Sequence, residues 1–381
     1  MNRSFGLRRM TIVGLNGLHC GEEYLETMNR RGLLRTAAPY HAVYRIVGLT
    51  PFTVDATDCC LRRSPCTVAY AAILLVLCLA ASVNVVHFLT VGQEHISALR
   101  FLWLTGTAIA ACLMAVVPVA TDLFVNTSRY QRILSLLSYR DTNILELKHS
   151  SNKRVTFGCK PLYVTAFVPF LYTVVWNVLQ KRSLYTTASM FFMQGLMLAA
   201  VSKYIILVML VTNDLRCLEE TLRAVKRPPP GAAHFRALRR VYRAVCGASH
   251  EVLAAHQCFL AVFTGTLLVS TSWHTVCFLL CSDHQLQQVV FLVWHTSLLL
   301  SVLVSSHALY EAQASIAATV CRRLQDVRTA SPDAKELRHF LLLVRSLRPE
   351  HRIFGVVPLD LRLVATFLST YTTYTVILMT F

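Results

Sequence analysis

The chain has 381 residues, of which 55% are hydrophobic and only 15% are charged, and its formal net charge is +17. Soluble domains average about 25% charged residues, so this composition excludes an ordinary soluble protein and indicates a polytopic membrane protein. The sequence lacks a Walker loop, a dinucleotide-binding fingerprint, a G-x-S-x-G motif and metal-ligand spacings of His or Cys. We therefore expect no catalytic residues, no metal site and no cofactor.

Seven stretches are long and apolar enough to cross about 30 Å of hydrocarbon. In chain order they lie at residues 66–89, 99–124, 161–179, 186–211, 252–280, 289–309 and 361–381. The third is short and contains Pro161 and Pro169, which membrane helices tolerate where neighbouring helices satisfy the freed carbonyls. The predicted fold is therefore an all-α membrane protein with seven transmembrane helices.

The positions of the basic residues predict the orientation of these helices. Of the 37 lysines and arginines, 32 lie before the first span or in the second, fourth and sixth connections. The other three connections hold only Lys181 and Arg182. Because basic residues in short loops stay on the cytoplasmic side, we expect a cytoplasmic N-terminus and an extracellular C-terminus. This asymmetry accounts for the high net charge, so binding to nucleic acid is not expected.

The inner connections are predicted to contain helices of their own. The fourth span should continue from Asn213 to about Val225, where residues 228–230 are consecutive prolines that stop a helix. A basic helix is expected around residues 235–245, with one side formed by Arg236, Arg239, Arg240 and Arg243. We interpret that side as a solvated face or as one attracted to the anionic inner leaflet.

Residues 332–353 have the pattern of an amphipathic cytoplasmic helix. Ser331 is a candidate N-cap, and Pro332 suits the first helical position. One apolar face is formed by Leu337, Phe340, Leu341, Val344 and Leu347. This face is expected to pack against another subunit or, alternatively, against the chain itself. Gly355 and Pro358 then break the helix and form a candidate hinge before the last span.

Lys203 is an ionisable residue in the inner half of the fourth span. Such a residue marks a functional site by default, because a charge at membrane depth is costly. Its long aliphatic stem could instead carry the ammonium group towards the cytoplasmic surface.

The end of the chain resembles the signature of the insect gustatory receptor family, which is Thr-Tyr, five hydrophobic residues, Gln and Phe. Thr373, Tyr374 and Phe381 match in place, and Thr375 is a mild departure within the hydrophobic run. Thr380 stands where the family usually has Gln. Two further stretches are similar to family segments: Gly-Leu-Thr-Pro-Phe at residues 48–52 and Gly-Val-Val-Pro-Leu-Asp at residues 355–360.

This resemblance covers the full length and implies a ligand-gated, non-selective cation channel that detects a small-molecule tastant. Such a channel would be a homo- or heterotetramer with other receptor subunits in a lipid membrane. Its expected location is the plasma membrane of chemosensory dendrites. The parts would be a cytoplasmic segment (1–65), a six-helix bundle with the ligand pocket and helical cytoplasmic extensions (66–309), a cytoplasmic anchor segment (310–360) and a pore-lining helix (361–381).

The last span has the pattern expected of a pore helix. A stripe about 80° wide, at 100° per residue, contains Thr366, Thr370, Thr373, Ile377 and Thr380. Hydroxyls can replace part of an ion's hydration shell, and an apolar ring of Ile377 can gate by dewetting. The alternative is that the hydroxyls bond back to carbonyls of their own helix and the stripe packs against a neighbour. Tyr374 falls outside the stripe and is expected to hold the helix in place.

Candidate pocket residues are polar or aromatic side chains in the outer halves of the spans. They are His87, Trp103, Thr105, Asn177, Gln194, Ser270, Thr271, Trp273, His274, Trp294 and His295. Aromatic rings can stack on a ligand while hydroxyls and imidazoles supply hydrogen bonds. The alternative is an aromatic belt at the membrane interface. Because the set contains no carboxylates, we favour bitter or other plant secondary compounds over sugars.

Three alternative functions remain open. A G-protein-coupled chemoreceptor would have the opposite orientation, and the chain lacks the Asn-Pro-x-x-Tyr and Asp-Arg-Tyr motifs of such receptors. A transporter is disfavoured because the seven spans contain no visible inverted repeat. An odorant-receptor-type channel subunit is disfavoured by the terminal signature.

Overall fold

The computed structural model describes residues 44, 49–50, 53–54, 61–62, 64–90, 98–147, 171, 175, 184–224, 231–280, 285–327, 331–347 and 352–380. The helices are α2 (Pro65–Thr90), α3 (Ala98–Phe124), α4 (Thr127–Leu147), α6 (Leu184–Ala224), α7 (Ala232–Leu280), α8 (Gln285–Asp326), α9 (Pro332–Ser346) and α10 (Arg362–Thr380). Two antiparallel hairpins pair β1 (Thr53–Val54) with β2 (Leu61–Arg62) and β3 (Arg352–Ile353) with β4 (Val357–Pro358).

The helical fold predicted from the sequence is confirmed. The spans predicted at 66–89, 99–124, 186–211, 252–280, 289–309 and 361–381 correspond to α2, α3, α6, α7, α8 and α10. The span predicted at 161–179 lies almost wholly outside the described residues. Within the described part, four helices have the length and hydropathy to cross a membrane: Pro65–Asn84, Phe191–Ala224, Ala232–Leu279 and Gln288–Asp326. A shorter apolar stretch, Cys112–Phe124, lies in α3.

The longest helix, α7, is the element on which most of the others pack. Its 49 residues extend about 73 Å at 1.5 Å per residue, more than twice the thickness of a hydrocarbon core. It contacts α3, α4, α6, α8, α9 and α10. The basic helix predicted around 235–245 is not separate from the span at 252–280, because the residues between them contain no proline. Gly247 lets α4 approach closely, since a Cβ there would lie 3.3 Å from Leu136 Cδ1.

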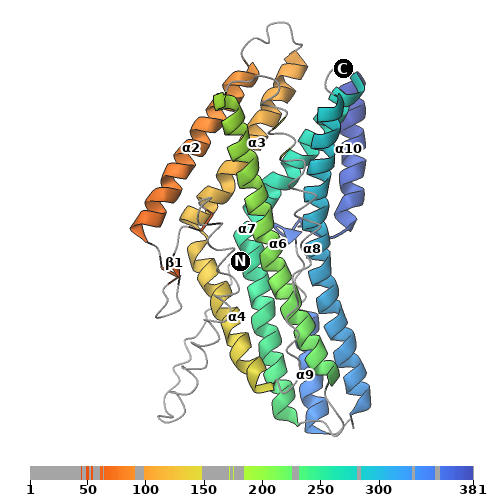
Figure 1. Ribbon diagram of the computed structural model, residues 1–381. Helices are drawn as coiled ribbons and strands as arrows, with labels where there is room; N and C mark the ends of the chain where they lie inside the picture. Colours follow the sequence, from red (N-terminus) through yellow and green to blue (C-terminus); the bar gives the residue numbers. More distant parts are fainter. Residues whose placement is uncertain are drawn as a thin grey trace, which may run out of the picture.

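The helices group differently at the two ends of the molecule (Figure 1). At one end, α4 and α9 lie beside the extensions of α6, α7 and α8. At the other end, α2 and α3 lie beside α6, whereas α10 packs against α7. The predicted continuation of the fourth span beyond Asn213 is confirmed, because α6 runs unbroken to Ala224.

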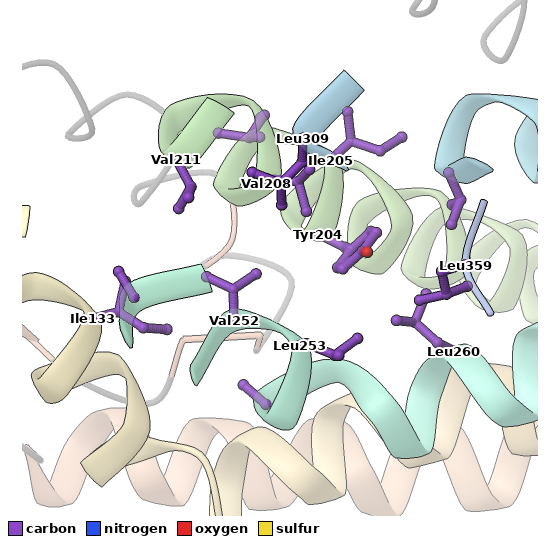
Figure 2. Close-up of a cluster of buried hydrophobic side chains, with 14 of the residues drawn as sticks. Ile133, Tyr204, Ile205, Val208, Val211, Val252, Leu253, Leu260, Leu309 and Leu359 are labelled. Atoms are coloured by element: carbon purple, nitrogen blue, oxygen red, sulfur yellow. The ribbon is translucent and has the colours of Figure 1, made fainter. Parts of the chain in front are cut away.

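A continuous apolar core joins the long helices. Figure 2 shows Tyr204 and Ile205 of α6 near Val252 and Leu253 of α7. The Tyr204 hydroxyl also forms a 2.8 Å hydrogen bond with Ser306 Oγ of α8. In the extensions outside the membrane, each buried aliphatic side chain contributes about 1.5–3 kcal/mol through the hydrophobic effect. Within lipid that driving force is absent, so close packing and interhelical hydrogen bonds hold the helices together.

The amphipathic helix predicted after Ser331 is confirmed as α9. The Ser331 side chain accepts a hydrogen bond from Ala334 N at 3.1 Å, as an N-cap should. The helix ends at Ser346 rather than at residue 353, because residues 352–353 pair with β4 instead. Its apolar face packs on α7 and α8 of the same chain. Leu337, Phe340 and Val344 are fully buried in this contact, whereas Leu341 and Leu347 are half-buried.

Charges reinforce the contact between α9 and α7. Glu336 forms ion pairs with Arg236 at 3.2 Å and with Arg239 at 3.1 Å. Two of the four arginines on the predicted basic side are therefore paired, while Arg240 and Arg243 are exposed. Partly exposed pairs of this kind contribute at most about 1 kcal/mol each, so they orient α9 more than they stabilise it.

A tight turn connects α9 to α10 where the sequence predicts a break. Gly355 has φ +74° and Phe354 has φ +49°, so the chain reverses through left-handed conformations between β3 and β4. Leu359 is buried after the turn. The Asp360 carboxylate then accepts a hydrogen bond from Arg362 N at 2.9 Å, which caps the start of α10. The hinge role of Gly355 and Pro358 stays a prediction.

Lys203 does not reach towards a surface but forms a buried ion pair. Its Nζ donates to Asp122 Oδ2 of α3 and to the Leu49 carbonyl, both at 2.6 Å. The two charged side chains are only 6% and 5% exposed. The ammonium also lies 4.1 Å from the centroid of the Tyr130 ring, a favourable cation–π contact. The sequence analysis did not identify Asp122 as the partner.

The second oxygen of Asp122 is also fully bonded. Asp122 Oδ1 accepts from Asn126 Nδ2 at 2.7 Å and from the Tyr130 hydroxyl at 3.0 Å. Asn126 Nδ2 donates in addition to the Ala255 carbonyl of α7 at 2.9 Å. The cluster therefore ties α3, α4, α6, α7 and the segment before the first span to one another.

Replacing Lys203 with Met should destabilise the fold by about 3–5 kcal/mol, because it leaves the Asp122 carboxylate buried without a cation. The midpoint of thermal unfolding of the purified protein measures this loss. Lys335→Met, at an exposed position of α9, is the matched control and should leave the midpoint unchanged. Adding Asp122→Leu to Lys203→Met should recover much of the loss. If the Lys203→Met variant unfolded at the same temperature as the wild type, the stabilising role of the pair would be contradicted.

Candidate functional site

One face of α10 packs on α7 and the other is uncovered. Leu363, Phe367, Tyr371 and Thr375 recur every four residues along α10 and are buried or half-buried. The helix contacts α7 along this face. The remaining surface is not covered by any described part of the chain. An exposed apolar helix face of this kind is available to lipid or to another subunit.

The predicted stripe lies on the uncovered side of α10. Thr366, Thr373, Ile377 and Thr380 are exposed, whereas Thr370 is half-buried. The Ile377 side chain is 44% exposed. The uncovered face is wider than the predicted stripe, because it also includes Leu368, Val376 and Met379. Tyr374, expected to hold the helix in place, is 44% exposed as well.

The hydroxyls of the stripe bond back to their own helix, which is the alternative that the sequence left open. Thr370 donates to the Thr366 carbonyl at 2.9 Å, and Thr373 donates to the Ser369 carbonyl at 3.0 Å. Thr380 donates to the Ile377 carbonyl at 2.8 Å. A hydroxyl has one hydrogen and two lone pairs, so each of these groups keeps its lone pairs for whatever faces it. Such a face accepts hydrogen bonds and attracts cations.

A second group of predicted residues comes together between α7 and α8. Ser270 Oγ lies 3.2 Å from His295 Nδ1. His274 Nδ1 lies 2.5 Å from Gln288 Oε1, and because an amide oxygen only accepts, the imidazole nitrogen donates. The His274 ring stacks on Phe291, with centroids 4.9 Å apart and planes 6° apart.

Trp294 completes this cluster. Its ring lies 5.3 Å from the His295 ring between centroids. The indole is 1% exposed, and Nε1 is buried with no hydrogen-bond partner among the described residues. Buried indole N–H groups usually have a partner, so this one is available to a ligand or a water molecule. We call Ser270, His274, Gln288, Phe291, Trp294 and His295 the α7–α8 cluster.

The sequence analysis missed two members of the α7–α8 cluster. Gln288 and Phe291 occupy the first two turns of α8, two turns and one turn, respectively, before the predicted residue His295. Their helical spacing relative to Trp294 and His295 was a usable signal, because residues three, four or seven apart share a helix face. The predicted residue Thr271 is less available, because its buried hydroxyl donates to the Leu267 carbonyl at 2.6 Å. Trp273 is half-buried.

The remaining candidates lie on other helices. His87 is exposed on α2, and Thr105 is half-buried on α3. Gln194 is half-buried on α6, where its Oε1 has no hydrogen-bond partner among the described residues. The side chain of Trp103 and the whole of Asn177 lie outside the described residues. His87, Thr105 and Gln194 lie on α2, α3 and α6, which pack on one another. The α7–α8 cluster instead adjoins Thr275 of α7, which contacts Tyr371 of α10, and Figure 1 shows α7, α8 and α10 together on the other side of the molecule.

The described residues contain no group of three or more His, Cys, Asp or Glu side chains that could hold a metal ion. The α7–α8 cluster likewise consists of neutral hydroxyl, amide, imidazole and aromatic groups. Such a cluster can stack on a planar ligand and exchange hydrogen bonds with it.

Comparison with solved structures shows the same fold in a known protein. The insect olfactory receptor OR5 from Machilis hrabei, determined in complex with eugenol, is similar with a TM-score of 0.66 and 13% sequence identity. The similarity covers 92% of this chain and 99% of that chain. No match is found among curated proteins.

The model of the 7tm chemosensory receptor family matches residues 37–381, which is nearly the whole chain and includes every described helix. With this match and the shared receptor fold, the chain belongs to the 7tm chemosensory receptor family.

Proposed function

We propose that this chain is a gustatory receptor subunit that forms a ligand-gated, non-selective cation channel in the plasma membrane of chemosensory neurons. The observation that carries the proposal is the uncovered face of α10, which combines threonine hydroxyls with the exposed side chain of Ile377. The terminal signature with Thr373, Tyr374 and Phe381 favours the gustatory type. One alternative is an odorant-type channel subunit of the same family. The other is a G-protein-coupled chemoreceptor, which would not be a channel.

In the proposed tetramer, the predicted stripes on the uncovered faces of four α10 helices surround a central pore. The back-bonded hydroxyls present lone pairs to a permeating ion, which suits a cation and excludes strong selectivity by fixed charge. Ile377 would form an apolar ring that excludes water when the pore is narrow. The cytoplasmic extensions and α9 would form the anchor between subunits. The buried face of α9 packs on its own chain, so its exposed side would contact a neighbouring subunit.

The proposed ligand site includes the α7–α8 cluster. Its stacked rings and neutral hydrogen-bonding groups suit a small planar compound with hydroxyl or carbonyl groups. Because the cluster contains no carboxylates, we favour bitter or other plant secondary compounds over sugars as the ligand class. The unpartnered Trp294 Nε1 would supply a hydrogen-bond donor to such a ligand.

Expression of the chain in cells with no related receptor should give ligand-evoked cation currents in excised patches without nucleotides, because a channel needs no soluble messenger. Patch clamp with a panel of bitter compounds and sugars measures this. An N-terminal epitope tag should be labelled only after permeabilisation. Surface labelling of intact cells, with currents that vanish on excision, would favour the G-protein-coupled alternative. An absence of current at normal surface expression would contradict function as a single-subunit channel.

Replacing Thr380 with Gln should change the relative permeability to sodium, potassium and calcium, because an amide would add hydrogen-bond donors to the proposed pore. Reversal potentials under bi-ionic conditions measure the change. Thr372→Gln is the matched control, since Thr372 is exposed on α10 but lies outside the predicted stripe. Equal permeability ratios in the Thr380 variant and the wild type would remove Thr380 from the pore.

Replacing His295 with Phe should raise the half-maximal ligand concentration roughly fivefold, which is the effect of losing one neutral hydrogen bond. Concentration–response curves at matched surface expression measure the shift, while permeability ratios should not change. His307→Phe makes the same replacement three turns further along α8 and should leave the curve in place. An identical shift in both variants would show that His295 acts through the helix rather than through a ligand.

A further inference from the structure

The buried face of α10 carries a polar contact with α7. The Tyr371 hydroxyl lies 2.5 Å from Thr275 Oγ1, so the two side chains are hydrogen-bonded across the helix interface. Both side chains are half-buried. This contact lies outside the proposed pore face of α10.

The direction of this hydrogen bond follows from the second contact of Thr275. Its hydroxyl donates to the Thr271 carbonyl of its own helix at 3.0 Å. A hydroxyl carries a single hydrogen, so Thr275 can only accept from Tyr371. The Tyr371 O–H is therefore the donor, and the contact depends on a phenol hydroxyl that phenylalanine would lack.

Thr275 lies in the same stretch of α7 that carries two of the six residues of the α7–α8 cluster. Ser270 and His274 bond to His295 and Gln288 of α8 within the turn and a half before Thr275. One short segment of α7 is thus bonded to α8 on one side and to α10 on another. A displacement of this segment of α7 moves the acceptor of the Tyr371 hydrogen bond.

The hydrogen bond between Tyr371 and Thr275 depends on the position of α10 relative to α7. A hydrogen bond is lost beyond about 3.5 Å, so a shift of one to two ångströms between the helices breaks this one. Within an apolar span no bulk water is at hand to replace it. One turn further along the same face, Thr375 is 8% exposed and its hydroxyl has no hydrogen-bond partner among the described residues. The interface therefore makes one polar contact and leaves another polar group without a partner among the described residues.

We propose that Tyr371 is a positioning residue for gating, and that its hydrogen bond to Thr275 tethers α10 back against α7. This proposal rests on the proposed channel function. The proposed pore face is centred about 120° around α10 from its α7 face, at 100° per residue. Movement of α10 towards the pore axis therefore also carries it away from α7. The tether opposes that movement and so favours the wider pore.

Tyr371→Phe and Thr275→Val should each raise the half-maximal ligand concentration about fivefold at normal surface expression, the effect of losing one neutral hydrogen bond. The double variant should show the same fivefold change rather than the product, because both replacements remove one bond. Thr275→Ser keeps the acceptor and should behave as the wild type. Permeability ratios should stay constant in all variants. Tyr310→Phe, at an exposed position of α8, is the control for loss of a phenol hydroxyl.

A second readout does not require current. Hydrogen exchange of the α10 amides around residues 367–375, measured by mass spectrometry on the full-length protein in lipid nanodiscs, should become several-fold faster in Tyr371→Phe than in Tyr310→Phe. If the wild type alone conducts no current, its function as a single-subunit channel is contradicted, while the exchange measurement still tests the tether. Unchanged exchange in Tyr371→Phe, or multiplicative effects in the double variant, would overturn it.

Discussion

The buried ion pair between Lys203 and Asp122 is the constraint on which the arrangement of the helices depends. Two charges at 5–6% exposure are costly unless each is paired and fully hydrogen-bonded. Here the ammonium needs both the Asp122 carboxylate and the Leu49 carbonyl, and the carboxylate needs Asn126 and Tyr130. A one-residue slip of α3 or α6 would leave a charge without its partner. The pair therefore destabilises alternative registers of α3 and α6 more than it stabilises the native register.

Helix α10 has fewer packing partners than the helices around the Lys203–Asp122 pair. Helix α7 packs on α3, α4, α6, α8 and α9, so it is held along most of its length. Helix α10, by contrast, rests on α7 and enters through the turn at Phe354 and Gly355. A helix with one packed face and a tight turn at its start can move as a unit. The same arrangement puts α10 next to α7 where α7 carries part of the α7–α8 cluster, the proposed ligand site.

Sequence patterns sufficed for elements whose signals are local. Hydropathy located α2, α3, α6, α7, α8 and α10. The Ser331-Pro332 pair predicted where α9 begins, because capping depends on neighbouring residues. Contacts between distant residues were not accessible in this way. Asp122 stands 81 residues before Lys203, and nothing in its own surroundings marks it as the partner. The end of α9 was missed for the same reason, since residues 352–353 are taken into a hairpin by residues that follow them.

Threonine suits both the uncovered face of α10 and the surface of α7 on which α10 packs, for one physical reason. On the uncovered face, the hydroxyls of Thr373 and Thr380 give their hydrogens to their own helix, so only lone pairs face outward. On α7, Thr275 does the same and thereby becomes an obligatory acceptor for Tyr371. A glutamine at position 380, as in the family signature, would instead present both a donor and an acceptor. In the proposed pore, a ring of four Thr380 side chains only accepts hydrogen bonds, whereas a ring of glutamines would both donate and accept them. The threonine ring therefore favours cations without adding a charge.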